Sequence, residues 1–227
     1  MMLKLTRNSV NVTHRLIFQR PAASLVTQGG RLLEALLDHV AIEYTVLPQD
    51  IHVKSGQILD ECSLRISMFN GLGKVAVTAA GVECSFQNLS SDKDLEVVAD
   101  VVDRVLLAVS SHTPTLKSSA ESISGNVSWR VLDGALARAE YFGRVLFPGR
   151  TSVHEDVSVR ARIRHHAQPS IGSFELAPRW GETDQAVLFF DVDLSELKTT
   201  EFKHRVTVAN ELIQIALTSF DLEQVKA

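Results

Sequence analysis

The chain has 227 residues, of which 45% are hydrophobic and 22% are charged, and its formal net charge is −4. This is the balance of an ordinary globular protein, long enough to bury a core of its own. The mild acidity gives no general argument for binding nucleic acid or an anionic membrane. The sequence has neither the roughly 18-residue apolar run of a membrane span nor the apolar segment of a secretory signal. We therefore expect a soluble, cytoplasmic protein that does not contact a membrane.

The first part of the sequence predicts a long strand, a helix and a meander of strands. Apolar and polar residues alternate from Val10 to Phe18, which indicates a strand with His14 on its apolar side. A helix is expected over Ala22–Val40, interrupted at Gly29 and Gly30, and a further strand over Ile42–Val46. The meander comprises a short extended piece at 51–53, strands over 62–68, 75–79 and 82–86, and turn residues at 70–73.

A long helix and a second series of elements follow. Ser91 and Asp92 can cap a helix whose apolar stripe runs to Val109. Residues 110–119, with Pro114, are typical of a linker. The later elements are a strand at 127–131, a helix over 133–142, a loop at 147–156, strands over 157–163, 173–176 and 186–194, and a closing helix over about 199–222, with plausible caps at 199 and 200.

This order of elements predicts an α+β fold built by tandem duplication. Each half contains a strand, a helix, an antiparallel meander and a long helix, so the expected units are residues 1–112 and 120–227, joined by a linker at 113–119. The helices are expected to pack on one face of one or two antiparallel sheets. The sequence leaves open whether the units form one merged domain with a continuous sheet.

The first candidate site is a row of arginines. Arg160, Arg162 and Arg164 alternate on one strand, so their guanidinium groups project to one side about 7 Å apart. Such a row can meet a carboxylate-rich protein partner or phosphates. No aromatic residues are interleaved with the arginines, which makes nucleic acid an unfavoured partner. The row can also pair within the sheet with the acidic residues of neighbouring strands, Glu175, Asp191 and Asp193.

Three large apolar residues extend this candidate surface. Val187 and Phe189 occupy strand positions that should face solvent, so a helix, the other half of the chain or another subunit is expected to cover them. Trp180 lies at an expected hairpin tip, where it either serves an interface or folds back onto the core. Together with the arginine row, these residues are our predicted partner-binding site.

The remaining polar candidates predict no chemistry. His165 and His166 are adjacent in an expected strand and should point to opposite faces, so they cannot easily share a metal ion. Asp191 and Asp193 could hold a cation or act as an acid/base pair, but they extend an acidic surface instead of ending at a cleft. Recognisable phosphate-binding, nucleophile-elbow and zinc motifs are absent. No catalytic residue, metal site or cofactor is therefore assigned.

We therefore expect a non-enzymatic protein-interaction module: an oligomeric adaptor, a chaperone-like protein or an assembly subunit that contacts a protein partner or itself. The alternative is a small-molecule-binding domain or enzyme with an apolar pocket inside a curved sheet. His14 and Tyr44 would then supply the polar groups of the pocket. Cys62 and Cys84 fall among apolar residues and are expected to be buried, free thiols in a reducing compartment.

Overall fold

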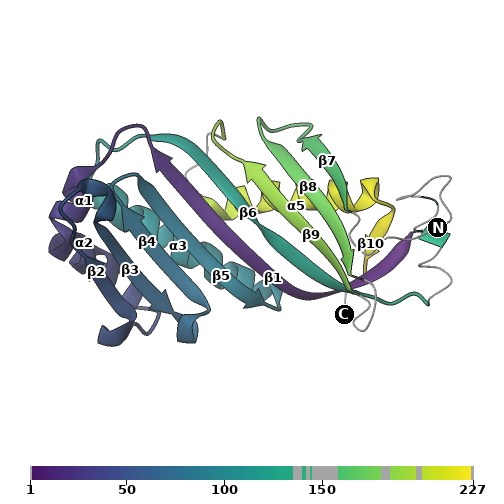
Figure 1. Ribbon diagram of the computed structural model, residues 1–227, viewed down its shortest axis with the longest axis horizontal. Helices are drawn as coiled ribbons and strands as arrows, with labels where there is room; N and C mark the ends of the chain where they lie inside the picture. The colour runs from purple at the N-terminus through teal and green to yellow at the C-terminus, as the bar shows by residue number, and fades with distance from the viewer. Residues whose placement is uncertain are drawn as a thin grey trace.

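The described part of the chain forms a single, largely antiparallel sheet of ten strands with helices along one face, as Figure 1 shows for the computed structural model. The structure describes residues 2–134, 140–141, 144, 158–179, 185–197 and 201–225. The α+β class that the sequence predicts is confirmed. The strands are β1 (Leu3–Phe18), β2 (Ile51–Lys54), β3 (Ser63–Met68), β4 (Gly73–Thr78), β5 (Gly81–Leu89), β6 (Ser118–Val131), β7 (Val159–Arg164), β8 (Ile171–Arg179), β9 (Gln185–Asp193) and β10 (Leu222–Gln224).

The two halves of the chain meet in the middle of this sheet. The strand order is β2-β3-β4-β5-β1-β6-β9-β8-β7, and the short β10 pairs in parallel with the start of β1. β1 and β6 pair along almost their whole length, from Leu5 opposite Val131 to Phe18 opposite Ser118. The sheet is therefore continuous across the predicted linker, and β2 and β7 are its edges.

Two long helices, α3 and α5, lie behind the sheet in Figure 1 and contact each other. α3 begins with a capping box, in which Ser91 Oγ accepts from the backbone N–H of Asp94 at 3.2 Å and the Asp94 carboxylate accepts from the backbone N–H of Ser91. Backbone hydrogen bonds from Ser90 and Ser91 lower the pKa of Asp94. The helices are α1 (Ala23–Thr27), α2 (Gly29–Leu36) with its π-helical extension η1 (Leu37–Ala41), α3 (Asp92–His112), α5 (Phe202–Ser219) and the short 3₁₀ turns η2 (Pro48–Asp50), η3 (Leu59–Glu61) and η4 (Phe69–Gly71).

The core lies between the helices and the apolar side of the strands. Leu64, Ile66 and Met68 of β3 are buried, because alternate residues of a strand share one face. Val102 and Val105 of α3 are buried in the same core. No described helix crosses the opposite face of the sheet, which is the face toward the viewer in Figure 1. We call it the open face.

One predicted strand is wrong, and β1, β6 and β8 are much longer than predicted. β1 begins at Leu3 and β6 at Ser118, because the two central strands extend each other's pairing. The predicted strand at Ile42–Val46 is instead a turn and an irregular segment that follow the π-helical extension. There the Tyr44 hydroxyl donates to Asp100 Oδ2 of α3 at 2.7 Å. Packing against α3 thus outweighs a short alternating pattern, which is a weak signal for a strand.

Most of the other predicted helices, strands and turns in the described residues are confirmed. The meander of β2 to β5 is antiparallel throughout. Its turn uses positive φ at Asn70 and Gly71, 56° and 86°, which these residue types tolerate. The predicted break in the first helix falls at Gln28, between α1 and α2. Most of the predicted helix at 133–142, the loop at 147–156 and the caps at 199 and 200 lie outside the described residues.

Candidate functional site

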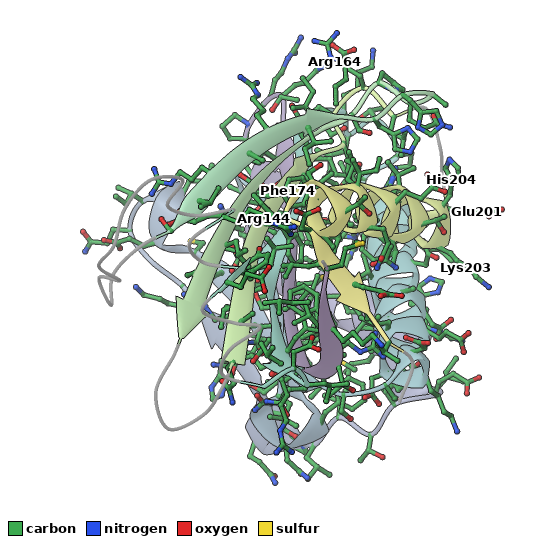
Figure 2. All side chains as sticks on the ribbon, turned by 90° about the vertical axis from the view of Figure 1, so that its right-hand side faces the viewer. Arg144, Arg164, Phe174, Glu201, Lys203 and His204 are labelled. Atoms are coloured by element: carbon green, nitrogen blue, oxygen red, sulfur yellow. The ribbon has the colours of Figure 1, made fainter. Side chains whose placement is uncertain are left out.

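The predicted arginine row lies on β7, at one edge of the sheet. The side chains of Arg160, Arg162 and Arg164 are all exposed. Arg160 Nε donates to Glu175 Oε2 of β8 at 2.9 Å, whereas the other two arginines form no ion pair with a described residue. Figure 2 shows Arg164 at the periphery of the molecule, while Phe174 of β8 lies inside, next to α5. Pairing within the sheet therefore engages one arginine and leaves the others open to a partner.

The acidic residues of β9 stand level with these arginines. Arg162 and Asp191 are opposite the same residue of β8, which lies between them. Arg164 and Asp193 are related in the same way. Two strand spacings, about 10 Å in total, separate each pair, and no ion pair joins them. The sheet thus carries a basic row and an acidic row, two strands apart and in register.

Two apolar residues of β9 lie on the same face. Leu188 and Phe190 belong to the core, so Val187 and Phe189 project to the open face. Phe189 stands level with Arg160 and is 40% exposed, whereas Val187 is only 7% exposed. We call this surface the charged face; it consists of the outward side chains Arg160, Arg162, Arg164, Glu175, Val187, Phe189, Asp191 and Asp193.

The carboxylates of the charged face act as hydrogen-bond acceptors. Hydrogen bonds from Ser158 and then Arg160 lower the pKa of Glu175. Asp193 Oδ1 accepts from the backbone N–H of Ser195 at 2.9 Å and from its hydroxyl at 2.6 Å. Three arginines and three carboxylates balance across the charged face. A balanced surface suits a protein that carries both charges better than it suits a polyanion.

His14, the first residue of the alternative site, belongs to a buried ion network. Its Nε2 lies 2.7 Å from Glu121 Oε1 and carries the proton, because an ionised carboxylate can only accept. The same oxygen accepts from Arg205 Nη1 at 2.6 Å. His14 and Glu121 are 2% and 5% exposed, and the ring of Phe202 packs edge-on against His14. The network joins β1, β6 and α5 inside the molecule, which is a structural role.

Tyr44, the second residue of the alternative site, is also held in a structural contact. Burial and its hydrogen bond to Asp100 raise the pKa of Tyr44 to about 12. An apolar pocket does lie between the sheet and helices α3 and α5, but its described lining includes neither His14 nor Tyr44.

His165 and His166 stack on each other and do not point to opposite faces. They follow the last residue of β7, so the alternation of a strand does not apply to them. Their rings are 15° from parallel, with centroids 4.8 Å apart. His165 Nδ1 accepts from the backbone N–H groups of Ala167 and Gln168, so Nε2 carries the proton that it donates to Glu211 at 2.6 Å. His165 therefore anchors the β7–β8 loop to α5.

The other candidates add no reactive group. Among the described residues, no three His, Cys, Asp or Glu side chains gather where they could hold a metal ion. The described helices include none with the length and apolar character to cross a membrane. The prediction of buried cysteines is confirmed for Cys84 and wrong for Cys62, which precedes β3 and is only half-buried; both are free thiols. Trp180 lies outside the described residues.

Sequence reasoning missed two members of the buried network, Glu121 and Arg205. A signal for Glu121 was available, because it shares the parity of Ile123 and Val127 on β6 and so lies on the apolar side, as His14 does on β1. A carboxylate at such a position needs a buried cation. No local pattern indicates that Arg205, 84 residues further on, is that cation.

Comparison with models of known protein families finds no match to this chain, and comparison with curated proteins finds no similar sequence.

Proposed function

We propose that this chain is a non-enzymatic protein-interaction module that associates with a second copy of itself through the charged face. The observation that supports this is the register of the two rows: Arg162 stands level with Asp191, and Arg164 with Asp193, on either side of β8. An adaptor, chaperone-like or assembly role follows from such a surface, because the surface recognises a protein and performs no reaction.

A two-fold axis that runs parallel to β8, just outside the charged face, makes this surface complementary to itself. Rotation about such an axis lays β7 of one copy over β9 of the other without changing the level along the strands. Arg162 then faces the partner's Asp191, and Arg164 faces the partner's Asp193. Each contact occurs twice, so four ion pairs would form.

The apolar residues complete the proposed contact. Phe189 is 40% exposed and stands level with Arg160, so the same rotation sets the ring against the partner's Arg160, over which it can stack. Burial of Phe189 would supply affinity, while the charged rows would fix orientation and exclude unsuitable partners. Pairing through the exposed edge of β7 is disfavoured, because it would bring two rows of arginines together.

A charge-swap experiment tests this arrangement. Light scattering after size exclusion, at two protein concentrations, should give the mass of a dimer for the natural chain. R162D should shift the protein toward monomer, and R162D combined with D191R should restore the dimer, because opposite charges again face each other. A monomeric natural chain, or a double variant no better than the single one, would contradict the proposed contact.

Phe189 has a matched control on the same face. F189D should also produce monomer, because it places a charge at the contact. Ile17 of β1 is 43% exposed on the open face in the other half of the sheet, so I17D should leave the mass unchanged. An equal effect of both variants would point to general destabilisation instead of a specific contact.

The strand order also supports the tandem duplication that we propose for the origin of the chain. Outward from the central β1–β6 pair, β5, β4 and β3 on one side correspond to β9, β8 and β7 on the other. α3 follows β5 and α5 follows β9. We further propose a cytoplasmic location, which the two free thiols support.

Small-molecule binding is the second candidate function. The observation that favours it is the apolar pocket on the helix-covered side of the sheet.

A further inference from the structure

A pocket of about 210 Å³ lies between the middle of the sheet and the two long helices. An engineered apolar cavity of about 150 Å³ is large enough to bind benzene, whereas ordinary cores have few voids larger than a water molecule. The sheet wall consists of Val10, Val12, Ile123, Val127, Trp129 and Phe190. α3 and α5 supply a helix wall that is also mainly apolar. The pocket therefore has the size and the surface to hold a small organic molecule.

Among the described lining residues of this pocket, Arg7 and Asp92 are charged, and we call their side of the pocket its rim. Arg7 Nη2 and Asp92 Oδ1 are 2.7 Å apart, and their ion pair ties β1 to the first residue of α3. The rim continues into a groove between α3 and α5 whose charged lining is Asp92, Glu96, Asp100, Asp103 and Lys203. Because four of these five side chains are carboxylates, the approach to the pocket disfavours an anion. No other described lining residue of the pocket is charged.

One polar group of the sheet wall lacks a partner. Trp129 is 1% exposed, and its indole Nε1 is buried without a hydrogen bond from the described residues. Buried indole N–H groups usually donate to an acceptor, because a buried donor without a hydrogen bond is unfavourable. Of the described pocket-lining residues, only Trp129 has such an atom. Trp129 stands opposite Arg7 in the β1–β6 ladder, and both residues line the pocket.

We propose that this pocket is a binding site for a neutral, mainly apolar molecule that carries one hydrogen-bond acceptor, such as a ketone or ester oxygen, and that Trp129 Nε1–H donates to this acceptor. The enclosed part of the ligand would have roughly eight to ten non-hydrogen atoms, by scaling from the benzene-sized cavity. A longer ligand would extend past the ion pair of Arg7 and Asp92. The site is on the side of the sheet opposite the charged face, so it does not depend on self-association.

Acetophenone and ethylbenzene are suitable probes, because they share a carbon skeleton and differ by the carbonyl oxygen. In titrations of the full chain followed by nuclear magnetic resonance, both should bind, with the ketone about three- to tenfold tighter. The ketone should also shift the Trp129 indole N–H resonance strongly. Trp180 provides the second indole signal, so W129F identifies which resonance belongs to Trp129.

Two variants separate the parts of the proposal. W129F keeps an aromatic ring but removes the donor, so the preference for acetophenone should disappear while ethylbenzene still binds. A209L adds bulk to the helix wall of the pocket and should abolish binding of both probes. I17D, on the open face and outside the charged face, should bind both probes as the natural chain does.

Three results would overturn the inference. If neither probe binds the natural chain, the pocket is not a ligand site. If both bind equally and the indole resonance does not respond to the ketone, Trp129 is not the donor. If A209L still binds both probes, binding occurs elsewhere. Should W129F fail to fold, W180F removes the other indole resonance, so the remaining signal still shows whether Trp129 donates to the ketone.

Discussion

Polar groups on the two faces of the ten-stranded sheet differ in their exposure and in their pairing. On the open face, Arg15 and Glu83 form a cross-strand ion pair whose side chains are 57% and 42% exposed. On the helix-covered face, Glu121 is 5% exposed and meets both His14 and Arg205. Water screens charges on the first face, so they do not each need a partner within the protein. On the second face burial favours pairing, and Trp129 Nε1, which has no partner among the described residues, is the group on which the proposed ligand site rests.

The largest expected effect comes from breaking the buried network. E121Q removes the buried negative charge that meets both His14 and Arg205, and should lower the free energy of unfolding by about 3–5 kcal/mol. E83Q, which breaks the exposed pair with Arg15, should cost about 1 kcal/mol or less. Denaturant unfolding of both variants checks this, and similar losses would mean that burial does not distinguish the two faces.

A loss of stability of intermediate size should distinguish the closely packed part of the helix-covered face from the part that borders the pocket. Ala209 and Ala216 are both buried on α5, at 4% and 0% exposure, but only Ala209 lines the pocket. A216L should cost about 1–3 kcal/mol by overpacking, whereas A209L should be nearly neutral because the pocket receives the added atoms. Equal losses in thermal or denaturant unfolding would mean that the space beside Ala209 is not available.

The smallest effect on stability concerns the two thiols. Burial, with a smaller contribution from the charge of Glu83, raises the pKa of Cys84 from 9.0 to about 12. The folded state favours the neutral thiol. The contribution of Cys84 to the free energy of unfolding is therefore complete below pH 9 and is lost as the pH rises toward 12. At pH 8 a thiol reagent should therefore label the half-buried Cys62 first and Cys84 only on unfolding.

C62S provides the control for this labelling. It should remove the fast phase and leave a single thiol that reacts only in denaturant. Rapid labelling of the folded C62S variant would show that Cys84 is accessible, contrary to its place under the helices.

The sequence by itself determined which side of each strand enters the core. The alternation around Arg162 and Phe189 assigned both to the open face, because a period of two is a local property of an extended chain. Helix α3 and its cap at Ser91 could also be predicted from the local sequence, since the capping box lies within four residues. The failures at Ile42–Val46 and at His165 came where a contact with a helix set the backbone or ended the strand.

Only the tertiary structure decided how these faces are used. The rows on β7 and β9 come into register through β8, and Arg205 reaches Glu121 across 84 residues of sequence. The pocket and the unpaired Trp129 Nε1 depend on how α3 and α5 rest on β1, β6 and β9. Pairing partners and empty volume are properties of segments far apart in the chain, so no local pattern encodes them.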